Sequence, residues 1–208
     1  RAVLGNPRLL LLDEPLSALD DGLKFHIVPF LKDVCKTFTI PYLFISHSLL
    51  EMQIMTDQVL SLSEGRVLEK TTAEALVRAR MGESMAGYMN LLRLSLPQAI
   101  DGIYSYNWGG QQLLIASGDA QPEGLFELFS TDIILFKNHP EAISARNLLQ
   151  CRVVKTFEAR HRVGVDLDCG GDGHLVAEVS RQAVDELDIK EGSEVFAAIK
   201  ATAFRKLV

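Results

Sequence analysis

The chain has 208 residues, of which 48% are hydrophobic and 23% charged, and its formal net charge at pH 7 is −6. This composition is typical of a globular protein with one or two domains. The acidic balance argues against nucleic-acid binding, because a phosphate backbone requires a basic surface. The three cysteines form no C-x-x-C pair, which argues against a zinc site or disulfide framework and favours a reducing compartment.

The first predicted element is a strand at residues 9–12, where four leucines run into two adjacent carboxylates. A strand that is apolar on both faces is typical of the centre of a parallel sheet covered by helices. Ligands of such sheets lie at the carboxyl ends of the strands, where Asp13 and Glu14 fall. One acid would hold Mg²⁺ and the other would polarise an attacking water. Taken alone, a strand that ends in solvated acids explains the stretch better.

A helix and a second strand follow. Apolar residues recur at helical spacing between Leu23 and Val34, and a buried strand at residues 42–45 ends in Ser46 and His47. A strand–helix–strand unit implies parallel strands, so we expect His47 near the two acids, where its imidazole would contact a phosphate oxygen. A third strand at residues 58–62 leads into a Glu64-Gly65 turn.

The stretch LLLLDEPLSALD followed by ISHS resembles the second half of an ABC-transporter ATPase domain, over residues 1–82. The resemblance implies that Asp13 is the Walker B acid and Mg²⁺ ligand, and that Glu14 is the catalytic glutamate. It makes His47 the switch histidine that senses the γ-phosphate. Ser17 and Asp20 fall in the D-loop and are expected to contribute to nucleotide binding.

The phosphate-binding half of such a domain is missing from the sequence. No G-x-x-x-x-G-K-[ST] motif and no LSGGQ-type signature is present, and the chain opens with Arg1. Backbone N–H groups and the lysine of that loop supply most of the grip on a triphosphate. We therefore expect a fragment of a longer subunit that neither binds nor hydrolyses ATP by itself. Its strand at residues 9–12 would have an open apolar edge.

The second part of the chain has the alternation of β-structure. Residues 83–141 are predicted to be a linker and a degenerate first β-barrel unit, and residues 142–208 a compact barrel of the oligonucleotide/oligosaccharide-binding type with a short helix at 180–187. The glycine pairs at 109–110 and 170–171 are typical of hairpin turns. Residues 125–137 and 195–207 share apolar spacing, through either an internal repeat or chance similarity of alternating strands.

A cluster of polar residues precedes a predicted strand in ISARNLLQCRV, residues 143–153. A tetrahedral oxyanion needs several converging N–H and O–H donors. The segment 144–147 would supply a hydroxyl, backbone N–H groups, a guanidinium and an amide, and Lys200 and Thr202 would add an ammonium and a hydroxyl. On chemistry alone, a solvated turn explains the segment equally well.

Residues 142–208 are similar to the molybdate-binding Mop domain of the TOBE class, which occurs in small molbindins and in the ATPase subunit of molybdate importers. In that family the anion lies between subunits. Tungstate has the same charge and nearly the same size and is expected to bind similarly, whereas sulfate is smaller. The oxyanion-binding positions that the resemblance implies are Ser144, Ala145, Arg146, Asn147, Ser180, Lys200, Ala201 and Thr202.

The two parts together resemble the ATP-binding subunit of a molybdate ABC importer. The implied fold is an α/β remnant of an ABC ATPase domain, a P-loop NTPase without its N-terminal half, followed by an all-β OB-like TOBE/Mop domain. The intact subunit would use ATP and Mg²⁺, and its β-domain would bind molybdate or tungstate. Implied partners are a second copy, a membrane permease and, indirectly, a periplasmic molybdate-binding protein.

The same resemblance places the subunit at the cytoplasmic face of the inner membrane and implies that the fragment is soluble. Anion-bound β-domains would hold the ATPase halves apart, a coupling between two sites. Two alternatives remain. One is an importer ATPase for sulfate, phosphate, iron or a sugar, against which the S-x-R-N element argues. The other is a non-enzymatic molbindin-like sensor or storage module that carries an ATPase remnant.

Overall fold

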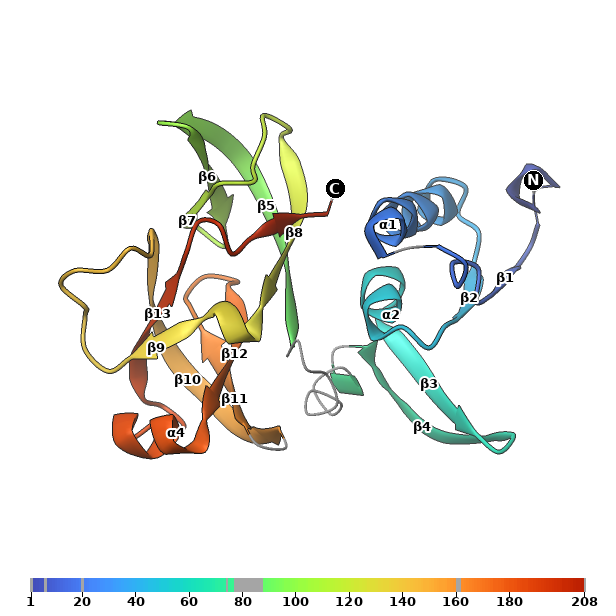
Figure 1. Ribbon diagram of the computed structural model, residues 1–208. Helices are drawn as coiled ribbons and strands as arrows, with labels where there is room; N and C mark the ends of the chain where they lie inside the picture. The colour runs from blue at the N-terminus through green and yellow to red at the C-terminus, as the bar shows by residue number, and fades with distance from the viewer. Residues whose placement is uncertain are drawn as a thin grey trace. The chain divides into compact units, whose positions relative to one another are not determined.

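The computed structural model describes residues 2–5, 7–19, 21–73, 75–76, 88–159 and 162–207 (Figure 1). The chain divides into two compact units, one within residues 1–79 and the other within residues 80–207. In the described ranges, every helix is too short or too polar to cross a membrane.

The first unit begins with a strand–helix–strand motif. After the short turn η1 (Ala2–Gly5), β1 (Leu10–Asp13) and β2 (Tyr42–Ile45) pair in parallel, connected by α1 (Asp21–Thr37). This confirms the predicted parallel pair. Helix α2 (Leu49–Met55) follows, and β3 (Gln58–Ser63) and β4 (Arg66–Thr72) form a hairpin around Glu64-Gly65.

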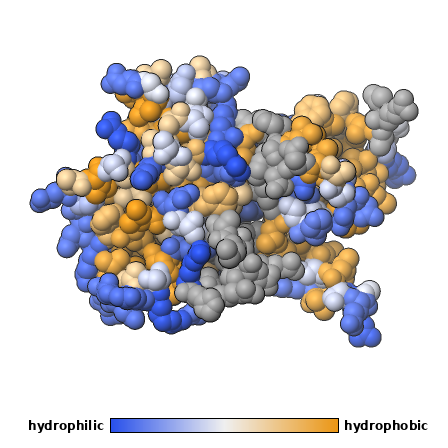
Figure 2. All heavy atoms as spheres, viewed as in Figure 1, coloured by the Kyte–Doolittle hydropathy of each residue, from blue (hydrophilic) through white to orange (hydrophobic). Residues whose placement is uncertain are grey.

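β1 is not a central strand, contrary to the pattern of its leucines. Among the described strands it pairs with β2 alone. Leu11 is 66% exposed and Leu43 on β2 is 57% exposed, and Figure 2 shows hydrophobic side chains at the surface of this unit. The open apolar edge predicted for this strand is therefore confirmed. A small core around Leu10, Cys35 and Ile40 covers only one part of the strand pair.

The second unit consists of two five-stranded antiparallel sheets. In the first sheet the order is β14-β8-β5-β6-β7, and in the second it is β12-β11-β10-β13-β9. The strands are β5 (Met89–Ile100), β6 (Ile103–Trp108), β7 (Gln111–Ile115), β8 (Glu123–Phe129), β9 (Ile134–Phe136), β10 (Asn147–Ala159), β11 (Arg162–Asp168), β12 (His174–Ser180), β13 (Glu194–Ile199) and β14 (Arg205–Lys206).

The first half of this unit contains β5 to β9 and the second half β10 to β14, and each sheet is completed by the last strand of the other half. β9 follows β8 and a short turn, η3 (Ser130–Asp132), but pairs with β13, so that Leu135 faces Ala197. β14 follows β13 but pairs with β8, so that Lys206 faces Phe126. Residues 125–137 and 195–207 thus have the same strand–turn–strand course and pair with each other. When the two segments are superposed by these strand pairings, Phe126 is equivalent to Ala197. The apolar spacing of the sequence matches Phe126 instead to the preceding residue, Phe196.

One hydrophobic core joins the two halves. It includes Tyr106 and Phe126 from the first half and Leu167 and Phe204 from the second, all almost completely buried. Cys151 and Cys169 are also buried there, with their sulfur atoms 2.8 Å apart. Contact with the Cys151 thiol and burial both raise the pKa of Cys169. The two halves therefore fold as one unit.

The two Gly-Gly pairs form the predicted hairpin turns. Gly109-Gly110 joins β6 to β7, and Gly170-Gly171 joins β11 to β12, all with positive φ. The turns touch, because a Cβ atom on Gly171 would lie 1.9 Å from the Gly109 carbonyl oxygen. Only glycine satisfies both the backbone conformation and this close approach.

Candidate functional site

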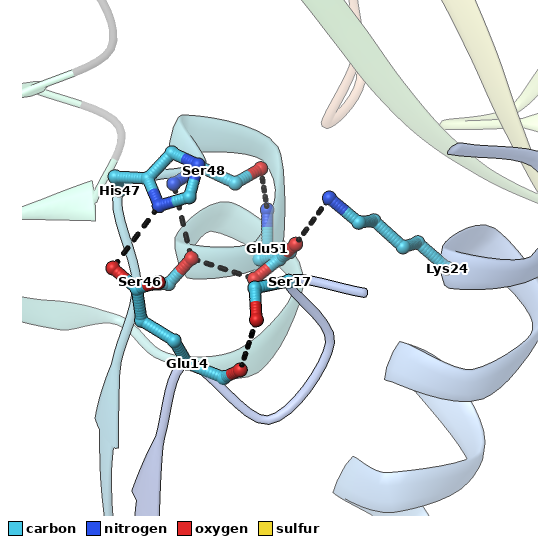
Figure 3. A network of polar contacts seen from close by, with 7 residues as sticks. All are labelled: Glu14, Ser17, Lys24, Ser46, His47, Ser48 and Glu51. Carbon is cyan, nitrogen blue, oxygen red and sulfur yellow. Dashed lines mark hydrogen bonds and ion pairs between the residues drawn. The ribbon is translucent and has the colours of Figure 1, made fainter. Parts of the chain in front are cut away.

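Polar side chains of the first unit meet where β1 and β2 end (Figure 3). Asp13 is the last residue of β1, and Glu14 follows with a φ of 40°. The His47 Nδ1 atom lies 3.2 Å from Glu14 Oε1, and both side chains are exposed. The parallel pairing of the two strands therefore brings the predicted switch histidine and catalytic glutamate into contact.

Of the two predicted D-loop residues, only Ser17 lies in the described part of the chain. The Ser17 hydroxyl donates a hydrogen bond to the Glu14 carbonyl oxygen, at 3.0 Å, and so closes the turn after β1. Asp20 lies outside the described residues. Within the described part of the chain, no three His, Cys, Asp or Glu side chains gather in a group that could hold a metal ion.

A second polar network, which was not predicted from the sequence, joins α1 to the start of α2. Glu51 is buried, accepts a hydrogen bond from the Ser46 hydroxyl at 2.6 Å, and contacts the Lys24 ammonium at 3.3 Å. The Ser48 hydroxyl caps α2 by accepting the Glu51 N–H. The S-L-L-E spacing from Ser48 to Glu51 is the sequence signal of such a helix start.

In the second unit, the two segments predicted to bind an oxyanion lie side by side. β10 and β13 are antiparallel and pair Asn147 with Ile199, so the residues just before Asn147 adjoin those just after Ile199. Two hydroxyls and two cationic groups therefore share one end of this ladder, and all four side chains are exposed: Ser144, Arg146, Lys200 and Thr202. Ala145 is half-buried and Ala201 is buried.

The Asn147 side chain forms hydrogen bonds with the backbone of two other strands, β7 and β13. Its Oδ1 accepts the Leu114 N–H at 2.7 Å, and its Nδ2 donates to the Leu114 carbonyl oxygen at 2.9 Å and to the Ile199 carbonyl oxygen at 3.3 Å. Asn147 is 2% exposed. Its amide thus fixes the 144–147 segment against β7 of the first half.

Ser180 lies at the other end of the barrel from this segment. It pairs with Arg162 on β11, which in turn faces Ala159 at the end of β10 opposite to Asn147. The Ser180 hydroxyl caps α4 (Arg181–Leu187) by accepting the Ala183 N–H at 3.1 Å, which confirms the predicted helix start. A single chain therefore does not bring Ser180 to the other predicted oxyanion-binding residues.

Comparison with known families identifies the class of the second unit. Residues 143–205 match the TOBE domain family. The chain therefore carries a TOBE domain, which spans the strands that hold the 144–147 and 200–202 segments.

The sequence relationship extends over nearly the whole chain. Molybdenum import ATP-binding protein ModC of Rhizobium meliloti strain 1021 is 32% identical over 216 residues, and ModC of Mannheimia succiniciproducens is 34% identical over 212. ModC of Escherichia coli K12 is 30% identical over 210 residues. Each match covers 98% of this chain but 59% of the relative. The chain is thus homologous to ModC molybdate import ATP-binding proteins and spans about three fifths of their length.

Two solved structures align with parts of the chain. The cytoplasmic molybdate-binding protein ModG, with molybdate bound, is 20% identical with a TM-score of 0.48 and covers 56% of this chain and 94% of that chain. MopII of Clostridium pasteurianum is 35% identical with a TM-score of 0.27 and covers 29% of this chain and 90% of that chain.

Proposed function

We propose that the second unit binds molybdate or tungstate beside the β10–β13 ladder and serves as the regulatory domain of a molybdate importer's ATP-binding subunit. The observation that carries the proposal is the juxtaposition of residues 144–146 with residues 200–202. Two cationic side chains and two hydroxyls would meet a tetrahedral dianion there, with the backbone N–H groups of the same segments.

The pocket is proposed to be completed by a second copy of the chain. Ser180 lies at the far end of its own barrel, so it would reach the anion only from another subunit. Asn147 would contribute by holding its segment in place, because its amide is engaged by Leu114. A homodimer with the anion between subunits accommodates both residues.

The first unit is proposed to be the C-terminal part of an ABC ATPase domain, an α/β remnant within residues 1–82. The Glu14–His47 contact supports this, since a general base and a γ-phosphate sensor act at the same end of parallel strands. The exposed carboxylates of Asp13 and Glu14 are ligands that Mg²⁺ prefers, and Asp13 would hold the ion. The 208-residue chain is expected not to hydrolyse ATP, because it lacks the G-x-x-x-x-G-K-[ST] loop.

In the intact subunit, ATP hydrolysis would drive a membrane permease from the cytoplasmic face of the inner membrane. A periplasmic molybdate-binding protein would deliver the substrate to that permease. Molybdate bound to the β-domain would couple cytoplasmic anion concentration to ATPase activity, as feedback between two sites.

Calorimetric titration with molybdate, tungstate, sulfate and phosphate tests the proposal. Arg146→Ala and Lys200→Ala are each expected to weaken molybdate binding about 10- to 100-fold, as expected for loss of a charge-assisted hydrogen bond. Arg152→Ala, an exposed basic residue further along β10, is the matched control and should bind normally. Tighter binding of sulfate or phosphate than of molybdate would favour an importer for another solute. Unchanged affinity in both variants would refute the site.

A further inference from the structure

We propose that the first half of the second unit holds a counterpart of this oxyanion pocket, and that the protein's own Glu178 carboxylate fills it. Each chain would then keep one pocket open and one closed. The open pocket rests on the proposed function, whereas the closed pocket is inferred from contacts within the chain alone.

The correspondence between the two places follows from two asparagines. Asn90 on β5 accepts the Val176 N–H at 2.7 Å and donates to the Val176 carbonyl oxygen at 2.9 Å and to the Leu128 carbonyl oxygen at 3.2 Å. Asn147 makes the same three bonds, to Leu114 and Ile199. Each asparagine thus bridges a neighbouring strand of its own sheet and a strand of the other half.

The residues around Asn90 therefore correspond to those of the predicted anion site. Tyr88 stands two residues before Asn90, as Ala145 stands two before Asn147. Ser130 stands two residues after Leu128, as Ala201 stands two after Ile199. Ser130 and Tyr88 are in contact, because the Ser130 N–H donates to the Tyr88 carbonyl oxygen at 2.8 Å. The counterpart of the anion site is thus assembled and buried.

A carboxylate already occupies this counterpart. Glu178 Oε1 accepts the Tyr88 N–H at 2.9 Å and the Ser130 hydroxyl at 3.0 Å, and Oε2 lies 3.1 Å from Arg162 Nη1. The Glu178 side chain is 2% exposed. A backbone N–H, a hydroxyl and a guanidinium are the kinds of donor that bind a free oxyanion. A buried carboxylate persists only with such partners, so the pocket is built for negative charge.

The open site differs at the position that matches Glu178. Glu178 follows Val176 by two residues on β12, and Ala116 follows Leu114 by two residues at the end of β7. The Ala116 N–H donates to the Ala201 carbonyl oxygen at 2.9 Å, so this residue does border the predicted anion site. Alanine brings no carboxylate, which leaves the cationic groups of the 144–146 and 200–202 segments for an external anion.

Chemical rescue with formate, a carboxylate without a side chain, tests the closed pocket. Glu178→Ala removes the internal carboxylate, and sodium formate is expected to raise the Tm of this variant by several degrees more than sodium chloride of equal ionic strength. Glu178→Gln, whose amide still fills the pocket, and the unmodified chain should show equal shifts in the two salts. Adding Arg162→Ala to Glu178→Ala should abolish the formate effect.

Glu178→Ser is measured in parallel with the same expectation, so that a poorly folding alanine variant does not end the test. A variant that folds only when formate is present also supports the proposal. Equal responses to formate and chloride in both Glu178→Ala and Glu178→Ser would overturn it. Because the measurement contains no molybdate, a chain that fails to bind molybdate would refute the proposed function and leave this result standing.

Discussion

Asn147 was predicted to bind a ligand, and its side chain also connects two strands of the fold. The S-x-R-N element predicts donors for an anion, and the residues around it do lie beside Lys200 and Thr202. The partner of the Asn147 amide, Leu114 on β7, lies in the other half of the unit and carries no recognisable pattern. Glu178 was missed for the same reason, since its partners Tyr88 and Ser130 are distant in sequence.

The hydrogen bonds of the Asn147 amide are expected to stabilise the fold. Asn147→Ala should lower the free energy of unfolding by about 1–3 kcal/mol, because the Leu114 N–H and carbonyl groups lose their partner in a nearly buried place. Urea denaturation of the purified chain measures this loss. Gln150→Ala, at an exposed position on the same strand, should unfold like the unmodified protein. Equal stability of all three proteins would show that the amide bonds contribute nothing.

At the scale of elements, local signals predicted the strands and turns well. The strand–helix–strand order, the 180–187 helix and both Gly-Gly hairpins follow from periodicity and turn chemistry, and the structure contains them. The exchange of β9 and β14 between the two sheets was not predictable. In such short strands, the alternation of apolar and polar residues does not decide which sheet a strand joins.

The glycine turns allow a matched comparison. Gly171→Ala should destabilise the second unit strongly, since its Cβ would lie 1.9 Å from the Gly109 carbonyl oxygen and its φ is positive. Gly110→Ala would hold an alanine at a positive φ, but its Cβ would meet no atom within 4 Å. The free energy of unfolding should therefore fall by about 1–2 kcal/mol. Thermal unfolding distinguishes the two. A Gly110→Ala variant as unstable as Gly171→Ala would contradict the close approach of the turns.

The exchanged strand β14 brings Arg205 to the buried carboxylate of Glu127 on β8. Burial raises the pKa of Glu127, and the hydrogen bond from Arg205 opposes that rise. Arg205→Met should lower the free energy of unfolding near pH 7 by about 1–3 kcal/mol, because the buried carboxylate loses its cationic partner. Glu127→Gln in the same chain should restore much of the loss.

The pH dependence of Arg205→Met has a defined sign. The folded-state pKa of Glu127 is raised, so at pH values between the unfolded and the folded pKa the native chain holds a proton that the unfolded chain has released. Stability therefore falls as the pH rises through the folded pKa. The deficit of Arg205→Met should therefore be smaller at pH 5 than at pH 7, as measured by urea denaturation at both values. A deficit independent of pH would show that lost packing, and not the carboxylate charge, explains the effect.

For the whole molecule, we propose that the second unit binds a tetrahedral metalate where residues 144–146 adjoin residues 200–202. The resemblance to the Mop family predicted these residues, and the β10–β13 register brings the two segments together. How copies of the chain would complete the pocket is not encoded in any local pattern, because it depends on surfaces that meet only on association.

Anomalous scattering at the molybdenum edge, measured on crystals of the chain grown with molybdate, locates the bound anion. We expect one strong peak per chain, within hydrogen-bonding distance of the Arg146 and Lys200 side chains, and no peak at Glu178. A peak elsewhere with none at this end of the β10–β13 ladder, or no bound molybdenum at all, would contradict it.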